Sequence, residues 1–285
     1  MAEKIFLVSG ATDGIGRVTA LELARAGGQV ILIGRDPAKG ARVVGEIKRQ
    51  SGNAQVEFEL ADLSSQSDIR ALAGRLNDRL EHLDVLVNNA GAWFQRRTVS
   101  ADGIEMTFAL THLGYYLLTG LLFEKLQKAP AARIVNVSSM AHSGPQIDFD
   151  DPQGEARYSG WRAYQASKLA NILFTYRLAE KLGDGPDGGN VSANCLHPGF
   201  VASKFAHNNG GWLKWMMIIV QQLVAIGVQK GARTSVHLAT APEIEGVSGK
   251  YYVKCQDATS SAASHDQNAQ EKLWHLSEEL AEFSY

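Results

Sequence analysis

Short apolar runs alternate along the chain with longer stretches of helical periodicity. The short runs are rich in Val, Ile and Leu and have the length of buried strands, while the longer stretches repeat apolar residues every three or four positions. Such alternation is typical of a parallel sheet whose strands are connected by helices. We expect a doubly wound sheet of seven parallel strands at residues 4–8, 29–33, 55–59, 85–88, 133–138, 191–197 and 250–253. We expect helices at residues 15–26, 38–50, 66–80, 106–127, 163–182, 230–239 and 269–281.

The chain is expected to fold as a single α/β domain over residues 1–285. No internal repeat or long linker interrupts the alternation, and the segment 183–189, rich in glycine, is short enough to be a loop. With 285 residues and 45% hydrophobic residues, the chain can bury a large core. The longest apolar window, residues 212–226, is shorter than the roughly twenty residues of a membrane-spanning helix, so no transmembrane span is expected.

Charge and cysteine content argue against several classes of protein. The 28 Lys and Arg residues nearly balance the 30 Asp and Glu residues, so no net field attracts nucleic acid. The two cysteines, Cys195 and Cys255, lack the spacing of metal ligands, and we expect neither a disulfide scaffold nor a metal site. The N-terminus enters the first predicted strand without a signal-like segment, which predicts a cytoplasmic protein.

A glycine-rich turn follows the first predicted strand. Gly10, Gly14 and Gly16 have the spacing G-x-x-x-G-x-G and lead into a predicted helix. Backbone amides and the positive end of a helix can bind a pyrophosphate at such a turn, where a Cβ would obstruct its approach. The spacing differs from the usual G-x-G-x-x-G, and an ordinary tight turn is the alternative. Its position directly after the first strand favours a dinucleotide site.

The end of the second predicted strand indicates which dinucleotide binds. An acid at this place would accept hydrogen bonds from a ribose, whereas a cation would pair with a 2′-phosphate. The sequence there is Gly34-Arg35-Asp36, so a guanidinium is present and no carboxylate stands at Gly34 to repel a phosphate. This favours NADP(H) over NAD. The alternative is a solvated Arg35 that pairs with Asp36 or Glu57.

Tyr164 and Lys168 are spaced for joint acid/base chemistry. Four residues apart, they share one face of a predicted helix. A cation 4 to 5 Å from a phenol would lower the phenol's pKa by about 2 to 3 units at an effective dielectric constant of about 20. Tyr164 could then exchange a proton with a carbonyl or alcohol oxygen while hydride moves to or from a nicotinamide. The alternative is an aromatic residue and a snorkelling lysine on an amphipathic helix.

Five motifs along nearly the whole chain resemble the short-chain dehydrogenases/reductases. They are Gly10-x-x-x-Gly14-x-Gly16, Asn88-Asn89-Ala90-Gly91, Ser138-Ser139, Tyr164-Gln165-Ala166-Ser167-Lys168 and Pro198-Gly199-Phe200-Val201. His112-Leu113-Gly114 and His197-Pro198-Gly199 resemble the retinol-dehydrogenase-like branch. The resemblance implies a Rossmann fold and an NADP-dependent oxidoreductase acting on CH–OH donors.

The resemblance also assigns roles by matching position. Ser139 would orient the substrate oxygen together with the acid/base pair, while Ser138 faces the other way. Asp62 would contact the adenine, and Asn88 and Gly91 the ribose, although turn formation at strand ends is the alternative for Asp62 and Asn88. Ser203 would meet the carboxamide. The cofactor-binding set is Gly10, Thr12, Asp13, Gly14, Ile15, Gly16, Arg35, Asp62, Leu63, Asn89, Ala90, Gly91, Tyr164, Lys168, Pro198, Gly199, Val201 and Ser203.

One position departs from the family pattern. The family's fourth catalytic residue is an asparagine that helps hold a water linking the lysine to solvent, and Thr111 stands in its place. A threonine offers one hydroxyl where an amide offers both a donor and an acceptor group. We expect an enzyme that is slower in proton relay. The alternative is a catalytically weak protein that binds or senses NADP(H).

The segment of about residues 200–229 corresponds to the family's variable substrate loop. Trp212, Trp215 and Met216 within it, together with Trp93, predict an apolar pocket. A hydrophobic alcohol and its aldehyde or ketone, such as a retinoid, a steroid or a lipid aldehyde, would fit. A core or dimer helix is one alternative, and shallow contact with a membrane surface is another.

Two further expectations follow from the resemblance and from the scattered histidines. Family members often form dimers or tetramers through paired long helices, so a homo-oligomer is expected. His112, His142 and His197 each lie near a motif, and none forms a catalytic triad with Ser139. We expect these histidines to serve in packing or turns rather than as proton shuttles.

Overall fold

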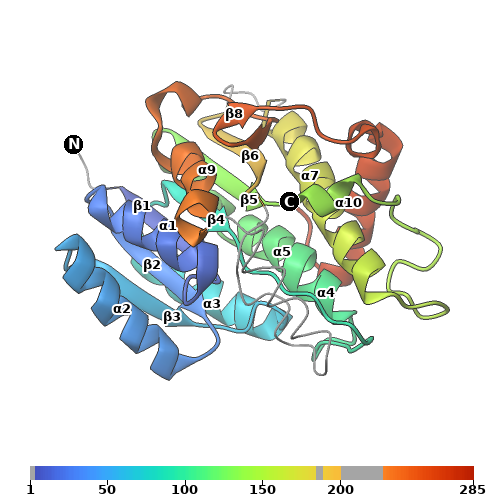
Figure 1. Cartoon of the computed structure of the whole chain (residues 1–285), viewed down its shortest axis with the longest axis horizontal. Coiled ribbons are helices and arrows are strands. Elements are labelled where there is room, and N and C mark those ends of the chain that lie inside the picture. Colours follow the sequence, from blue (N-terminus) through green and yellow to red (C-terminus); the bar gives the residue numbers. More distant parts are fainter. Residues whose placement is uncertain (1–3, 184–188, 200–226) are drawn as a thin grey trace.

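The computed structural model describes residues 4–183, 189–199 and 227–285 and is built around one sheet. The strand order is β3-β2-β1-β4-β5-β6-β7-β8 (Figure 1). Strands β1 to β7 pair in parallel, as predicted, and β8 adds an antiparallel edge to β7. The strands are β1 (Ile5–Ser9), β2 (Gln29–Gly34), β3 (Val56–Leu60), β4 (Val85–Asn88), β5 (Ala132–Val137), β6 (Val191–His197), β7 (Tyr251–Val253) and β8 (Gln256–Asp257).

Helices cover both faces of the sheet (Figure 1). Phe6 and Val8 of β1 belong to the core on one face, while Ile5 and Leu7 belong to the core on the other, as the alternation of side chains along a strand requires. The first face is packed by α1 (Gly14–Arg25), α2 (Pro37–Ser51) and α9 (Val228–Thr240). The second face is packed by α3 (Gln66–Arg79), α5 (Gly114–Leu121), α7 (Gly160–Gly183) and α10 (Gln267–Ala281).

The strand order reverses between β1 and β4. The chain builds β1, β2 and β3 outward in one direction and then returns to place β4, β5 and β6 on the other side of β1. In open α/β sheets a ligand crevice forms at the carboxyl ends of the strands where the order reverses. A ligand site is therefore expected among the segments that follow β1, β4 and β5.

The helix predicted over residues 106–127 is interrupted in the structure. It consists of α4 (Met106–Phe108), a π-helical turn (Ala109–Leu113), α5 and α6 (Phe123–Gln127). A π-helical turn accommodates one extra residue, which an apolar pattern alone does not reveal, and such turns are frequent at functional sites. Thr111 lies within this turn.

Helix α10 packs against α5 and α7 through an aromatic cluster. The Trp274 ring lies 5.5 Å from the Tyr116 ring and 6.0 Å from the Phe174 ring, and the Tyr285 ring lies 5.0 Å from Trp274. The part of α5 and α7 under α10 is therefore buried within the chain, so a homo-oligomer formed by these helices would have to use other surfaces. None of the helices in the described ranges combines the length and apolar character that a bilayer crossing requires.

Candidate active site

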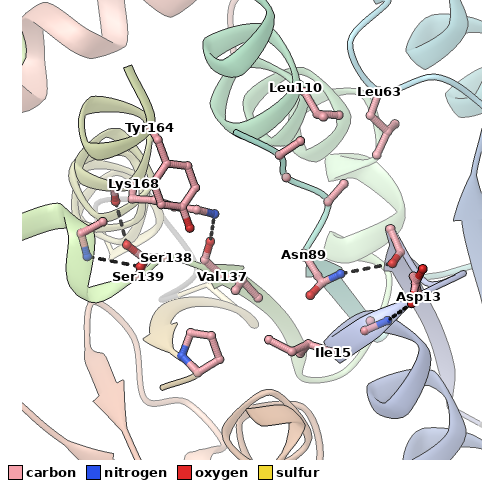
Figure 2. A pocket seen from close by; sticks show the side chains of 18 of the residues that line it. Asp13, Ile15, Leu63, Asn89, Leu110, Val137, Ser138, Ser139, Tyr164 and Lys168 are labelled. Atoms are coloured by element: carbon pink, nitrogen blue, oxygen red, sulfur yellow. Dashed lines mark hydrogen bonds between the residues drawn. The ribbon is translucent and has the colours of Figure 1, made fainter. Parts of the chain in front are cut away.

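A cavity of about 850 Å³ lies at the carboxyl ends of β1, β2, β4, β5 and β6. Its walls include the glycine-rich turn after β1, the segment after β4, the serine pair after β5 and residues of α7 (Figure 2). A cavity of this size is within the range of small-molecule and cofactor sites. The predicted residues that line it are Gly10, Thr12, Asp13, Gly14, Ile15, Gly16, Arg35, Asp62, Leu63, Asn89, Ala90, Gly91, Ser139, Tyr164, Lys168, Pro198 and Gly199.

The glycine-rich turn packs closely against the segment after β4, and its glycines line the cavity. Gly10 has a φ of +62°, and a Cβ on it would lie 2.9 Å from the Cα of Ala90. A Cβ on Gly16 would overlap the Asn89 side chain and the Gly10 carbonyl group. Helix α1 begins at Gly14, whose N–H donates to the Asp13 carboxylate at 2.8 Å, so the amino end of the helix borders the cavity. This glycine-rich cradle, a turn followed by the start of a helix on the cavity wall, is the arrangement in which dinucleotide pyrophosphates bind.

Two neighbouring asparagines after β4 have different roles. The Asn89 amide donates to the Ser9 carbonyl oxygen at 2.8 Å and so holds the glycine-rich turn in place. The side chain of Asn88 is buried instead, where its amide donates to Thr119 at 3.0 Å and to Asn136 at 2.9 Å. The expectation that Asn88 contacts the ribose is therefore wrong, because this residue ends the strand with its side chain in the polar core.

Arg35 lies exposed at the far end of the cavity and forms no ion pair within the described part of the chain. Its two expected partners are engaged elsewhere. Glu57 pairs with Arg79 at 2.9 Å, and Asp36 caps α2 by accepting from the Lys39 N–H at 3.0 Å. Arg35 is therefore solvated, as the alternative stated, but the expected pairing with Asp36 or Glu57 is wrong.

Lys39 and Gly34 add to this end of the cavity. Lys39, which was not predicted, lies in the first turn of α2 and lines the cavity, and its ammonium pairs with Asp13 at 2.8 Å. A second cation just after Arg35, at the start of a predicted helix, was the available signal. A Cβ at Gly34 would lie 2.8 Å from the Thr12 methyl group, so packing leaves no room for an acidic side chain there.

Asp62 lines the cavity and also forms a turn. Its carboxylate accepts from the Ser64 N–H at 3.0 Å and from the Ser64 hydroxyl at 2.7 Å. The turn-forming alternative is thus confirmed for Asp62, and it coexists with a position on the cavity wall.

Ser139, Tyr164 and Lys168 meet at one end of the cavity (Figure 2). The Ser139 hydroxyl is hydrogen-bonded to the Tyr164 phenol. The Lys168 ammonium donates to the Val137 carbonyl oxygen at 2.9 Å and lies 5.8 Å from the centre of the Tyr164 ring. Ser138 also lines the cavity, and its hydroxyl donates to the Lys168 carbonyl oxygen at 2.7 Å rather than contacting Tyr164.

Burial dominates the acid/base properties of this cluster. Burial raises the pKa of Tyr164 to about 12, against the opposing effect of the hydrogen bond with Ser139. Burial also lowers the pKa of Lys168 to about 7. The expected lowering of the Tyr164 pKa is therefore wrong for this structure, because the amine itself loses charge when buried and burial disfavours the phenolate. At neutral pH Tyr164 is protonated, which is the form that can donate to a carbonyl oxygen.

Thr111 is buried behind Gly91 and does not belong to the cavity wall that the described residues form. Its hydroxyl donates to the Ala92 carbonyl oxygen at 3.5 Å. A Cβ on Gly91 would lie 3.5 Å from both the Thr111 hydroxyl oxygen and the Lys168 ammonium, so these two groups flank Gly91. Tyr115, one turn later, was missed. Its ring centre lies 5.9 Å from that ammonium, and its buried hydroxyl has no hydrogen-bond partner among the described residues.

Trp161 and Met140 form an exposed apolar rim at the catalytic end of the cavity. They are 48% and 67% exposed, and the Trp161 ring lies 5.7 Å from the Tyr164 ring. Trp93 is not among the residues that line the cavity in the described part of the chain. It packs edge-on against Trp161 at 6.3 Å instead. Trp161 was not predicted, although its place three residues before Tyr164 on the same predicted helix was the signal. The predicted residues Val201, Ser203, Trp212, Trp215 and Met216 lie outside the described residues.

Comparisons with known proteins show which family the chain resembles. The sequence profile described as short chain dehydrogenase matches residues 4–214. Retinol dehydrogenase 11 of Homo sapiens is 41% identical, with 97% of this chain and 85% of the relative covered. Retinol dehydrogenase 12 of Mus musculus is 39% identical, with 97% and 86% covered.

Solved structures share the fold. A crystal structure of an uncharacterized protein from Mycobacterium paratuberculosis has a TM-score of 0.79 and 32% identity, with 100% of this chain and 95% of that chain covered. The Pseudomonas aeruginosa RhlG/NADP active-site complex has a TM-score of 0.68 and 25% identity, with 88% and 94% covered.

Proposed function

Because the chain belongs to the short-chain dehydrogenase/reductase family, in its retinol-dehydrogenase-like branch, we propose that it is an NADP(H)-dependent oxidoreductase that interconverts a hydrophobic alcohol and its aldehyde or ketone. The observation that carries the proposal is the meeting of Ser139, Tyr164 and Lys168 at one end of a cavity whose other end is the glycine-rich cradle. Acid/base groups and a dinucleotide-shaped cradle in one cavity serve a reaction in which a proton and a hydride move together.

Each residue of the cluster has a task that its position supports. NADPH, when bound along the cradle, would supply the hydride. Tyr164, protonated at neutral pH, donates its phenolic proton to the carbonyl oxygen, and Ser139 holds that oxygen through its hydroxyl. Lys168, anchored on the Val137 carbonyl oxygen, keeps a positive charge near the phenol when it is protonated. Alcohol oxidation uses the same groups in reverse.

The cations at the adenosine end support NADP(H) rather than NAD. Arg35 has no carboxylate partner among the described residues, Lys39 lines the same wall, and Thr12 fills the space where an acid at position 34 would stand. NADP is also present in the RhlG complex, whose fold this chain shares. The Arg35 guanidinium could bind a 2′-phosphate through two parallel N–H groups.

The Arg35→Ala variant is expected to weaken NADPH binding by about tenfold to a hundredfold, which is the range of a lost charge-assisted hydrogen bond. NADH lacks the 2′-phosphate, so its dissociation constant should change by less than about twofold. Nicotinamide fluorescence titrations measure both constants. Arg42→Ala, an exposed arginine on α2 away from the cavity, is the matched control. Equal weakening of NADPH and NADH would contradict a phosphate-binding role.

A hydrophobic substrate is supported by the apolar rim. The exposed faces of Trp161 and Met140 stand beside the catalytic phenol, where a polar substrate would gain nothing from them. The relatives are named retinol dehydrogenases, which makes a retinoid one member of the class to test. Absorbance of NADPH at its nicotinamide band, followed with retinal and a series of apolar aldehydes, tests the proposal. Turnover supports it, and the absence of turnover with every aldehyde contradicts it.

The threonine at position 111, in place of the family's asparagine, supports an alternative function: a protein that binds NADP(H) with little turnover. The Thr111→Asn variant distinguishes the two, because an asparagine side chain is longer than that of threonine and its amide offers both a donor and an acceptor beside Gly91 and Lys168. We expect the turnover number to rise by about tenfold or more, within the range of general acid/base effects. Thr111→Val, which keeps the shape and removes the hydroxyl, is the control and should lower turnover. An unchanged or lower value for Thr111→Asn would show that position 111 does not limit proton relay.

A further inference from the structure

Two buried histidines stand beside the serine that the proposed function uses. His142 lies in the short helical turn Met140–Ser143 after β5, and His197 ends the neighbouring strand β6. Their residues are 3% and 6% exposed. Burial lowers the pKa of both rings, that of His197 to about 4 with a contribution from His142, so both are neutral in the working range. A neutral imidazole has one donor nitrogen and one acceptor nitrogen.

The surroundings of His142 determine which nitrogen carries its proton. Nε2 lies 3.1 Å from the backbone nitrogen of Ser261, and a backbone N–H can only donate, so Nε2 accepts. The proton of the neutral ring is therefore on Nδ1. This nitrogen lies 2.7 Å from the carbonyl oxygen of Ser139 and donates to it. His142 thus links the backbone of the serine to the C-terminal part of the chain.

The surroundings of His197 determine the opposite tautomer. Its Nδ1 lies 3.1 Å from the backbone nitrogen of Met140 and 3.3 Å from that of Gly199. Both neighbours are donors, so Nδ1 accepts and the proton is on Nε2. One ring nitrogen therefore joins the residue after Ser139 to the loop after β6, and Pro198 and Gly199 of that loop line the cavity.

We propose that His142 and His197 are positioning residues, fixed as opposite neutral tautomers, that hold the peptide group between Ser139 and Met140 by its carbonyl oxygen and by its N–H, and that tie the serine turn to the Pro198–Gly199 loop. The Ser139 hydroxyl must meet the substrate oxygen within hydrogen-bond distance, and displacement of a catalytic group by about 1 Å can cost about a hundredfold in rate. A ring that merely fills space would not need a particular nitrogen at each contact. The link to catalysis rests on the proposed function, whereas the tautomers do not.

Asparagine and glutamine variants of each histidine distinguish the contacts of Nδ1 from those of Nε2. An asparagine places its polar atoms near the position of Nδ1, and a glutamine places them near Nε2. His142→Asn keeps a donor for the Ser139 carbonyl oxygen, and His197→Asn keeps an acceptor for Met140 and Gly199. The glutamine variants remove these contacts and keep comparable polarity. We expect the Asn variants to retain turnover within about threefold and the Gln variants to lose about tenfold to a hundredfold.

The cofactor gives a second readout on the same variants. His197→Gln should also weaken NADPH binding by a few-fold, because it releases Gly199 in the cavity wall, whereas His142→Gln should lower the turnover number and leave the NADPH dissociation constant unchanged. Circular dichroism spectra matching the wild type show that the variants are folded. Equal losses for Asn and Gln at either position, or wild-type turnover in the Gln variants, would overturn the proposal, because ring shape or packing would then account for the result.

A spectroscopic test does not depend on turnover. Nitrogen NMR of ¹⁵N-histidine-labelled protein at pH 7.5 distinguishes a protonated from an unprotonated ring nitrogen, and the His142→Asn and His197→Asn variants assign the two signals by their loss. We expect His142 to be protonated on Nδ1 and His197 on Nε2. The same tautomer in both rings would overturn the proposal. If the wild type reduces no aldehyde, the proposed function fails, while this spectrum still decides the tautomers.

Discussion

Replacing Tyr164 by phenylalanine is expected to lower turnover by about 10²- to 10⁴-fold, the usual contribution of a general acid/base group, while NADPH binding stays within about twofold. The phenol is buried, protonated at neutral pH and hydrogen-bonded to Ser139. Phenylalanine keeps the ring that packs 5.7 Å from Trp161 and removes only the hydroxyl. Steady-state rates of NADPH consumption with an apolar aldehyde measure the first quantity, and fluorescence titration measures the second.

The matched control is the same substitution on the same helix. The Tyr176 hydroxyl is hydrogen-bonded to Ser260 at 2.7 Å, and Tyr176 does not belong to the cavity wall that the described residues form. Tyr176→Phe should cost about 1 kcal/mol of folding stability from the lost hydrogen bond and leave turnover unchanged. Turnover of Tyr164→Phe within about threefold of the wild type would contradict the role of Tyr164 as the proton donor.

The parts of the fold that depend on periodicity could be predicted from the sequence. Runs such as Ile5 to Val8 are apolar at every position, as expected of strands whose two faces are both covered, and short runs rich in Val, Ile and Leu predicted most of the parallel strands. The edge strand β3 alternates apolar and acidic residues instead, and it was predicted from its length and its place between helical stretches. The strand β8 has only two residues, both exposed, and two residues carry no pattern. The π-helical turn at Ala109–Leu113 escaped prediction because one extra residue shifts the apolar repeat too little to be seen.

The parts of the candidate site that directly follow predicted strands could be predicted from the sequence. Ser139 and the glycine-rich turn follow parallel strands, so the topology brings them to one edge of the sheet. The direction in which a side chain points at a strand end could not be predicted. Asn88 and Asn89 are neighbours, yet the side chain of Asn88 turns into the core and that of Asn89 toward the cavity. Which one faces the ligand depends on packing that spacing does not express.

The electrostatic properties depend on contacts between distant segments. The sequence places a lysine beside Tyr164 but does not show that both groups are buried, and burial reverses the expected shift in the pKa of Tyr164. The tautomer of His142 is set by Ser261, which lies far along the chain. Such properties arise only when the fold has removed water from the groups concerned.

The Lys168→Met variant is expected to unfold at higher urea concentration than the wild type while losing about a hundredfold or more of its turnover. Burial lowers the pKa of Lys168 from 10.5 to about 7. At this position the unfolded chain therefore binds more protons than the folded chain between about pH 7 and pH 10.5, so the contribution of Lys168 to the free energy of unfolding rises with pH across that window. Methionine has a similar unbranched shape and no charge to bury, so at pH 7 we expect a gain of about 2 to 4 kcal/mol.

The pH dependence separates this explanation from a gain in packing. At pH 10 the buried lysine of the wild type is neutral in the folded state and mostly relieved of its desolvation cost, so the advantage of Lys168→Met should shrink to about 1 kcal/mol or less. The Val137 carbonyl oxygen keeps the Asn171 amide as a partner at 3.3 Å, so the substitution leaves it hydrogen-bonded.

Lys48→Met, at an exposed lysine on α2, is the control and should change stability by less than about 0.5 kcal/mol at either pH. A constant difference between wild type and Lys168→Met from pH 7 to pH 10 would contradict a lysine whose charge opposes folding. The expected outcome places Lys168 among residues whose chemistry is retained at a cost in stability, because the same burial that destabilises the ammonium brings it beside the reacting phenol.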